Sequence, residues 1–196
     1  MDKKQLITQA IENSVSLKNT ILGHEATLST IEKIADEVVS AFKSGKKVLL
    51  CGNGGSAADA QHIAAEFTGR YYIDREPLHA EALHANTSFL TAVANDYSYD
   101  EVYARGVKGM GKEGDVLIGI STSGNSKNVV KALEMAREKK MITVGLTGQD
   151  GGNMKNICTY LVAVPSKDTP RIQESHILIG HIIAEIVEKE IFNTHA

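Results

Sequence analysis

The sequence has no tryptophan, three prolines and two cysteines among its 196 residues. Cys51 and Cys158 stand in apolar surroundings and share no CxxC spacing. This excludes a disulfide framework and a cysteine zinc site, and we expect two reduced core side chains. Few prolines, 42% hydrophobic residues and 23% charged residues exclude a disordered chain and are typical of a globular protein.

Long apolar runs and basic clusters are also missing. No run approaches the roughly 18 apolar residues of a membrane span, and residues 1–20 lack the apolar stretch of a secretory signal. The formal net charge of −3, without clustered Lys and Arg, argues against nucleic-acid binding. We therefore expect a cytoplasmic protein with neither membrane nor nucleic-acid partners.

The sequence does contain a strand-loop-helix rhythm, which we interpret as one domain over residues 1–196. Two amphipathic helices open the chain, and we assign residues 1–45 to oligomerisation and 46–196 to an α/β core. Apolar strands separated by helix-length crossovers predict a three-layer fold, a parallel sheet with helices on both faces. The expected helices are 3–22, 28–42, 57–68, 127–138, a short one near 153 and a long terminal one, 171–191, with further helical stretches around 88–110. The expected strands are 47–51, 81–84, 115–120, 142–146 and 160–164.

Two loops follow strands and open helices, at the sheet edge where ligands bind in such folds. The first, 52–56, is rich in glycine, which lets a backbone approach a ligand closely. It has neither a GK[ST] sequence nor GxGxxG spacing, which disfavours nucleotide phosphate transfer and nicotinamide chemistry. The second, 121–126, places four hydroxyls at a helix N-terminus, where an anion is favoured. Capping by Ser126 would explain one hydroxyl but not four, so we expect phosphate there.

Two helices carry candidate metal ligands. His62 and Glu66 are four residues apart, which puts them on one helix face within joint reach of an ion. Such a pair also occurs on solvated faces, but this helix begins at the glycine loop. In the last helix Gln173, His176 and His181 stand among isoleucines and need polar partners. For His176 and His195 we expect either a core histidine bonded to a backbone carbonyl or a simply exposed side chain.

Three segments, 51–62, 120–126 and 171–174, resemble phosphoheptose isomerases, a family within the SIS-domain superfamily. The resemblance covers nearly the whole chain. It implies a flavodoxin-like SIS fold and the conversion of sedoheptulose 7-phosphate to glycero-manno-heptose 7-phosphate. That reaction is the first step of ADP-heptose or GDP-heptose biosynthesis, including the heptose of lipopolysaccharide. It also implies a cytoplasmic homotetramer with one zinc ion per subunit.

The resemblance further implies roles for individual residues. Glu66 and His181 would be catalytic, as base and acid or the reverse, and both would also bind the metal. The implied metal ligands are His62, Glu66, Gln173 and His181. The implied substrate contacts are Asn53, Gly54, Gly55, Ser56, Glu66, Asn95, Asp96, Ser121, Thr122, Ser123, Ser126 and Gln173. A polar segment, 78–88, departs from the family pattern, with Asn86 in place of an acid.

Other interpretations stay open at this point. The chain could be a noncatalytic SIS-domain adaptor that binds the replication initiator, although such an adaptor lacks counterparts of Glu66 and His181. A sugar-phosphate-sensing regulator or etherase of the same superfamily is a third class. Finally, Gln173 and His181 are about 12 Å apart along a straight helix, which is strained for one ion. We therefore expect an active site shared between subunits, with Glu66 and His181 from different chains.

Overall fold

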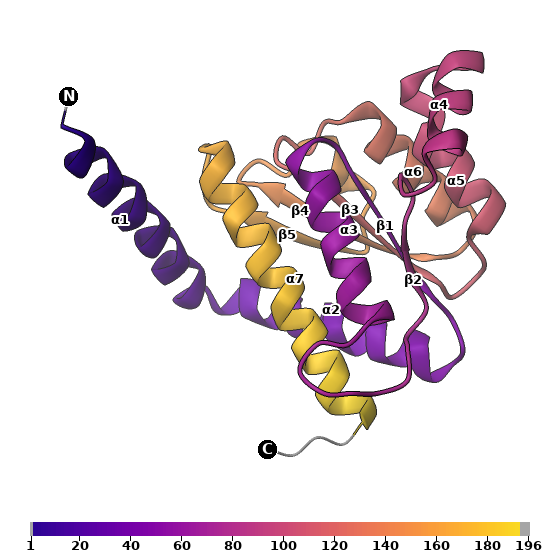
Figure 1. The fold of residues 1–196 in the computed structure, drawn as a ribbon, viewed down its shortest axis with the longest axis horizontal. Coiled ribbons are helices and arrows are strands. Elements are labelled where there is room, and N and C mark those ends of the chain that lie inside the picture. The colour runs from indigo at the N-terminus through magenta and orange to yellow at the C-terminus, as the bar shows by residue number, and fades with distance from the viewer. Residues whose placement is uncertain (1, 193–196) are drawn as a thin grey trace.

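Five parallel strands form a single sheet in the order β2-β1-β3-β4-β5 (Figure 1). This is the flavodoxin-like order, and the expected three-layer α/β fold is confirmed. The computed structural model describes residues 2–192. Its strands are β1 (Val48–Gly52), β2 (Ala80–Ala82), β3 (Val116–Ser121), β4 (Ile142–Gly148) and β5 (Tyr160–Val164).

Helices cover both faces of the sheet and divide the core into two apolar clusters. One cluster lies under α1 (Lys3–Leu22), α2 (Glu25–Lys43), α3 (Gly55–Thr68) and α7 (Thr169–Phe192). The other lies under α4 (Thr87–Asp96), α5 (Val102–Met110), α6 (Lys127–Glu138) and the 3-10 turn η2 (Gly152–Asn156). β1 and β3 are buried along their whole length because both faces are covered.

The chain reverses its direction of winding between β1 and β3, which are paired up to Gly52 and Ile120. Strand β2 lies on one side of β1, whereas β3, β4 and β5 follow on the other. The loops after β1 and β3 therefore emerge next to each other at the carboxyl edge of the sheet. In open α/β sheets this switch point is where ligands bind.

The helical stretches expected around 88–110 are confirmed. They are two helices, α4 and α5, separated by the 3-10 turn η1 (Tyr99–Glu101). Ser98 is fully extended, and the preceding polar residues Asn95 and Asp96 bond each other. Asn86, the departure from the family pattern, caps α4 by accepting a hydrogen bond from Phe89 N.

Helix α1 lies apart from the body of the molecule (Figure 1), and only Leu17 and Ile21 of its side chains are buried. Four residues of its first four turns, Leu6, Ile7, Ile11 and Val15, are between 47% and 61% exposed. Within residues 2–192 the structure contains no helix with the length and apolarity needed to span a bilayer.

Candidate functional site

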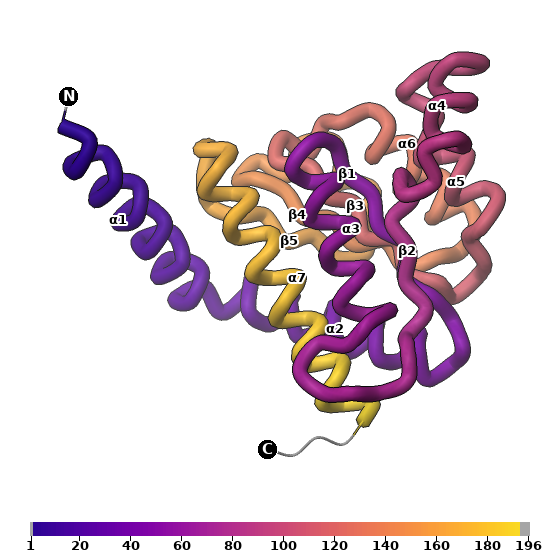
Figure 2. Tube along the Cα trace, viewed as in Figure 1, coloured from indigo at the N-terminus to yellow at the C-terminus, as the bar shows by residue number. Residues whose placement is uncertain are grey.

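Helices α3 and α7 run side by side in the same direction on one face of the sheet (Figures 1 and 2). Gly180 makes this close approach possible, because a Cβ there would lie 2.3 Å from Cδ1 of Ile63. Contacts between the two helices consequently occur at three levels along their length. Each level contains polar residues, and the middle one carries the candidate metal ligands.

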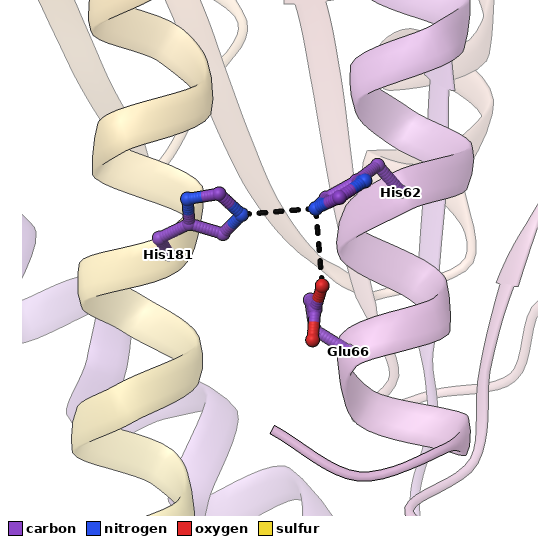
Figure 3. Close-up of side chains that lie close together, drawn as sticks. All are labelled: His62, Glu66 and His181. Atoms are coloured by element: carbon purple, nitrogen blue, oxygen red, sulfur yellow. Dashed lines mark hydrogen bonds and ion pairs between the residues drawn. The ribbon is translucent and has the colours of Figure 1, made fainter. Parts of the chain in front are cut away.

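At the middle level His62, Glu66 and His181 come together (Figure 3). Nε2 of His62 lies 3.0 Å from Oε1 of Glu66 and 3.0 Å from Nε2 of His181. The side chain of His62 is 53% exposed and that of Glu66 is 21% exposed, so the cluster is open to solvent. Two residues predicted from helical spacing thus meet a third from a helix more than a hundred residues later.

The cluster fits a zinc ion by its chemistry and its spacing. Two imidazole nitrogens and a carboxylate oxygen are the donors of catalytic zinc sites with three protein ligands. In a tetrahedral site with bonds of about 2.0–2.1 Å, donor atoms lie about 3.3 Å apart. The two 3.0 Å separations at His62 are close to that value.

One chain brings both Glu66 and His181 to His62, so the expectation that these two residues come from different chains is wrong. A contribution of other residues from a neighbouring subunit stays a prediction. The axial span from Gln173 to His181 is real, but α7 lies parallel to α3 and meets it at successive levels. Gln173 therefore faces the first turn of α3 while His181 faces its middle. The oligomeric state and the catalytic roles of these residues remain predictions.

At the upper level Gln173 packs against the glycine loop and Asp59. Its amide occupies the space a side chain at Gly55 would need, with Nε2 2.2 Å from the position of a Cβ there. Asp59 is 8% exposed. Burial raises the pKa of its carboxyl. A hydrogen bond from Gln173 and the nearby imidazoles of His62 and His181 lower this pKa, but burial has the larger effect. Sequence reasoning missed Asp59, although it lies on the same helix face as His62, three residues earlier.

At the lower level a buried ion pair joins the end of α3 to α7. Nε of Arg75 donates to Oε2 of Glu188 at 2.9 Å, and both side chains are at most 3% exposed. Nη2 of Arg75 also donates to the backbone oxygen of Glu66 at 2.7 Å. In the intervening loop the ring of Tyr71 lies 5.9 Å from that of His181. The ion pair thus holds the backbone at Glu66, and the loop places Tyr71 beside His181.

The serine loop holds its hydroxyls together. Oγ of Ser121 lies 2.9 Å from Oγ of Ser126 and 3.4 Å from Oγ of Ser123. Ser126 is the N-cap residue of α6, yet its side chain makes no capping hydrogen bond. Gly124 has a φ of 67°, and a Cβ there would lie 2.3 Å from the oxygen of Gly151. Beside the loop, Thr122 and Ser123 line a pocket of about 300 Å³ with Lys167.

The glycine loop is tied to α6 by a pair of amides. Asn53 and Asn128 exchange two hydrogen bonds of 2.9 Å, and Asn128 is 2% exposed. Sequence reasoning identified Asn53 but missed Asn128, whose only signal is its place two residues after the serine loop. Gly54, Gly55 and Ser56 form the turn into α3, with Gly54 at a φ of 56°.

Two other predicted contact residues are not brought to the cluster. Asn95 and Asp96 are exposed at the end of α4, where Nδ2 of Asn95 donates to Oδ1 of Asp96. His176 is a fully buried core histidine, with Nε2 3.0 Å from the oxygen of Thr147, which is the first of the two expected alternatives. Burial lowers its pKa to about 4. His195 lies outside the described residues. Cys51 and Cys158 are both free, as expected.

Comparison with known proteins finds similarity over almost the full length. Residues 13–148 match the SIS domain family. The phosphoheptose isomerase of Aneurinibacillus thermoaerophilus is 54% identical over 186 residues, 95% of this chain and 94% of that protein. The one from Clostridium acetobutylicum is 54% identical over 189 residues, 96% of each chain. A solved phosphoheptose isomerase from Neisseria gonorrhoeae superimposes with a TM-score of 0.90 at 39% identity, over 96% of this chain and all of that one. The solved phosphoheptose isomerase from Francisella tularensis superimposes with a TM-score of 0.92 at 34% identity, also over 96% of this chain and all of that one.

Proposed function

The chain belongs to the SIS domain family and to its phosphoheptose isomerase branch, and we propose that it interconverts sedoheptulose 7-phosphate and glycero-manno-heptose 7-phosphate. It is an isomerase of heptose metabolism. The observation that carries the proposal is the cluster of His62, Glu66 and His181, in a chain more than half identical to phosphoheptose isomerases.

The reaction moves a carbonyl between C2 and C1 of the sugar through an enediol. It requires a base that removes a proton from carbon and an acid that protonates oxygen. Glu66 and His181 supply these two groups, with Glu66 as base and His181 as acid, or the reverse. Their side chains reach the same point from two helices, so both can act on neighbouring atoms of one substrate. Tyr71 packs against His181 and limits its movement.

His62, Glu66 and His181 would hold one zinc ion per subunit. Gln173, which faces the first turn of α3, is included as a fourth ligand on the resemblance alone. The ion would act as a Lewis acid that polarises the sugar carbonyl. Because coordination weakens a carboxylate as a base, the two roles of Glu66 compete, and its second oxygen is the one available for the proton.

The phosphate of the sugar binds at the serine loop, which faces the start of α6. Ser121, Thr122, Ser123 and Ser126 contribute hydroxyls, and unpaired N–H groups of the helix terminus favour the negative charge. The loop and the glycine loop emerge side by side at the carboxyl edge of the sheet. A phosphate at one loop therefore directs the sugar past Asn53, Gly54, Gly55 and Ser56. We include Asn95 and Asp96 as sugar contacts on the resemblance alone.

The enzyme assembles as a homotetramer in the cytoplasm. The exposed apolar side chains of α1 support assembly, because a stripe formed by Ile7, Ile11 and Val15 covers one side of a helix that packs weakly on its own chain. The two free cysteines are consistent with a reducing compartment. The adaptor and regulator alternatives are not favoured, because the relatives above half identity are phosphoheptose isomerases.

Turnover of sedoheptulose 7-phosphate by zinc-loaded protein, followed as aldose formation, tests the proposal. We expect Glu66→Gln and His181→Gln each to reduce kcat by about 10²- to 10⁴-fold, the range typical of a positioned general acid or base. Circular dichroism checks that both variants keep the fold.

Glu113→Gln and His79→Gln are matched controls, since both residues are exposed and precede strands at the opposite edge of the sheet. Both should retain wild-type rates. Elemental analysis should find one zinc per chain, lost in His62→Gln. Wild-type protein that binds zinc but forms no aldose would refute the isomerase, and near-wild-type rates in both site variants would refute the catalytic assignment.

A further inference from the structure

Asn53 and Asn128 form a reciprocal amide pair across the switch point of the sheet. Nδ2 of Asn53 donates to Oδ1 of Asn128, and Nδ2 of Asn128 donates to Oδ1 of Asn53, both at 2.9 Å. Asn53 follows β1, and Asn128 stands in the first turn of α6, directly after the serine loop. The pair thus connects the loop assigned to the sugar with the loop assigned to the phosphate.

A backbone donor fixes which way round both amides lie. The N–H of Val129 donates to Oδ1 of Asn128 at 3.0 Å, and a backbone nitrogen can only donate. The amide oxygen of Asn128 must therefore face Val129, and its Nδ2 must face Asn53. It follows that Asn53 receives a donor at its oxygen and offers its nitrogen to Asn128.

Both lone pairs of the amide oxygen of Asn53 then accept hydrogen bonds from residues of the same chain. The hydroxyl of Tyr99 donates to it at 3.1 Å, in addition to Asn128, which fills the two lone pairs of an amide oxygen. The hydroxyl of Tyr103 lies farther away, at 3.4 Å, and gives its proton to the backbone oxygen of Gly52. One N–H of Asn53 remains without a hydrogen-bond partner among residues 2–192.

We propose that Asn128 is a positioning residue that locks Asn53 so that it presents only an N–H to the substrate. Asn53 then selects an acceptor oxygen, a sugar hydroxyl or the carbonyl, and cannot accept a hydrogen bond from the sugar. The inference rests on the proposed function, because that function places the sugar at Asn53. If Asn128 served only to hold α6, the effect of substituting it on substrate affinity would be the same with and without Asn53.

Asn128→Asp tests this role because it keeps an acceptor for Val129 N and Asn53 Nδ2 but cannot donate to the oxygen of Asn53. The lost orientation should raise KM for sedoheptulose 7-phosphate about five- to tenfold, the effect of one neutral hydrogen bond. We expect little change in kcat or zinc content, because the pair does not touch the metal cluster. Asn156→Asp places the same charge on an exposed residue and should behave as wild type.

A double-mutant comparison separates positioning from a structural role. Asn53→Ala, which removes the presented N–H, should raise KM by a similar factor. Adding Asn128→Asp to Asn53→Ala should raise it no further if Asn128 acts through Asn53. An unchanged KM in Asn128→Asp, or an equal increase with and without Asn53, would overturn the proposal. If Asn128→Asp does not fold, an unchanged KM in Asn53→Ala overturns it. A wild-type enzyme without turnover would instead remove the proposed function, and this inference with it.

Discussion

The hydroxyls of the serine loop bond to one another rather than to the helix they precede. Ser121 is 4% exposed and contacts both Ser123 and Ser126, whereas Ser126 does not cap α6. Hydroxyl pairs of this kind can exchange partners for a phosphate oxygen at little cost, since each hydroxyl can rotate. The simple capping interpretation accounts for none of these contacts, and their convergence supports the proposed phosphate site.

Removing one of these hydroxyls should weaken substrate binding. A hydrogen bond to a charged group contributes about 1.5–3 kcal/mol, so Ser123→Ala should raise KM for the sugar phosphate roughly 10- to 100-fold. Ser44→Ala, an exposed serine at the end of α2, is the control. Steady-state kinetics with both variants provides the measurement. A KM equal to that of the control would place the phosphate elsewhere.

Single residues were predictable from sequence where local spacing determines the geometry. His62 and Glu66 are one helical turn apart, so their common face follows from the period of the helix alone. The contact of His181 with them depends on the packing of α7 against α3, which local spacing does not contain. Asn128 was missed for the same reason, because its partner, Asn53, comes from a strand end 75 residues earlier.

At the scale of elements, the ion pair of Arg75 and Glu188 fixes the lower end of α3 to α7. Glu188 accepts hydrogen bonds from the backbone N–H groups of Tyr71, Tyr72 and Ile73 as well as from Arg75. Burial would raise the pKa of this carboxyl, but the hydrogen bonds from Tyr72, Arg75 and Tyr71 outweigh it and lower the pKa below 4.5. The charged form is therefore the one that the fold stabilises.

Glu188→Gln should lower the free energy of unfolding by about 3–5 kcal/mol, because it leaves the guanidinium of Arg75 buried without a counter-charge. Urea denaturation at neutral pH measures the loss. Glu185→Gln, one turn earlier, removes the half-buried partner of the exposed Lys189 and should cost at most about 1 kcal/mol. Since the pKa of Glu188 is lowered by folding, its contribution is present above pH 4.5 and is lost as pH falls through the folded pKa. Equal losses in the two variants would contradict this role.

Most elements were predictable because their apolar patterns are strong, and helices 3–22 and 127–138 have the expected bounds. The helical stretches expected around 88–110 are α4 and α5. The position of the break between them, where Ser98 is extended, was not predicted, because it depends on how the two helices pack over the sheet.

At the scale of the whole molecule, the parallel arrangement of α3 and α7 brings His62, Glu66 and His181 together within one chain. Both helices cover the same face of the sheet, α3 as the crossover after β1 and α7 as the last element after β5, with their N-termini at the ligand-binding edge (Figure 2). The glycine loop, the His62 cluster and the Arg75 pair are then successive levels of one interface within one chain. The expectation from sequence considered only the distance between Gln173 and His181 along a straight helix, not the packing of that helix against α3. It therefore assigned His181 to a neighbouring subunit.

Subunit mixing tests this intramolecular site in the proposed tetramer. Glu66→Gln and His181→Gln subunits each contain one defective residue of the pair that a single chain brings together. Every site in a mixed tetramer therefore lacks one of the two groups, and we expect activity to stay at the level of the separate variants. Exchange is verified by mass spectrometry of differently tagged subunits, and mixing wild-type with Glu66→Gln subunits provides the control, which should give activity proportional to the wild-type fraction. Activity that rises well above the separate variants would show that Glu66 and His181 meet across a subunit boundary, and the site described within one chain would be wrong.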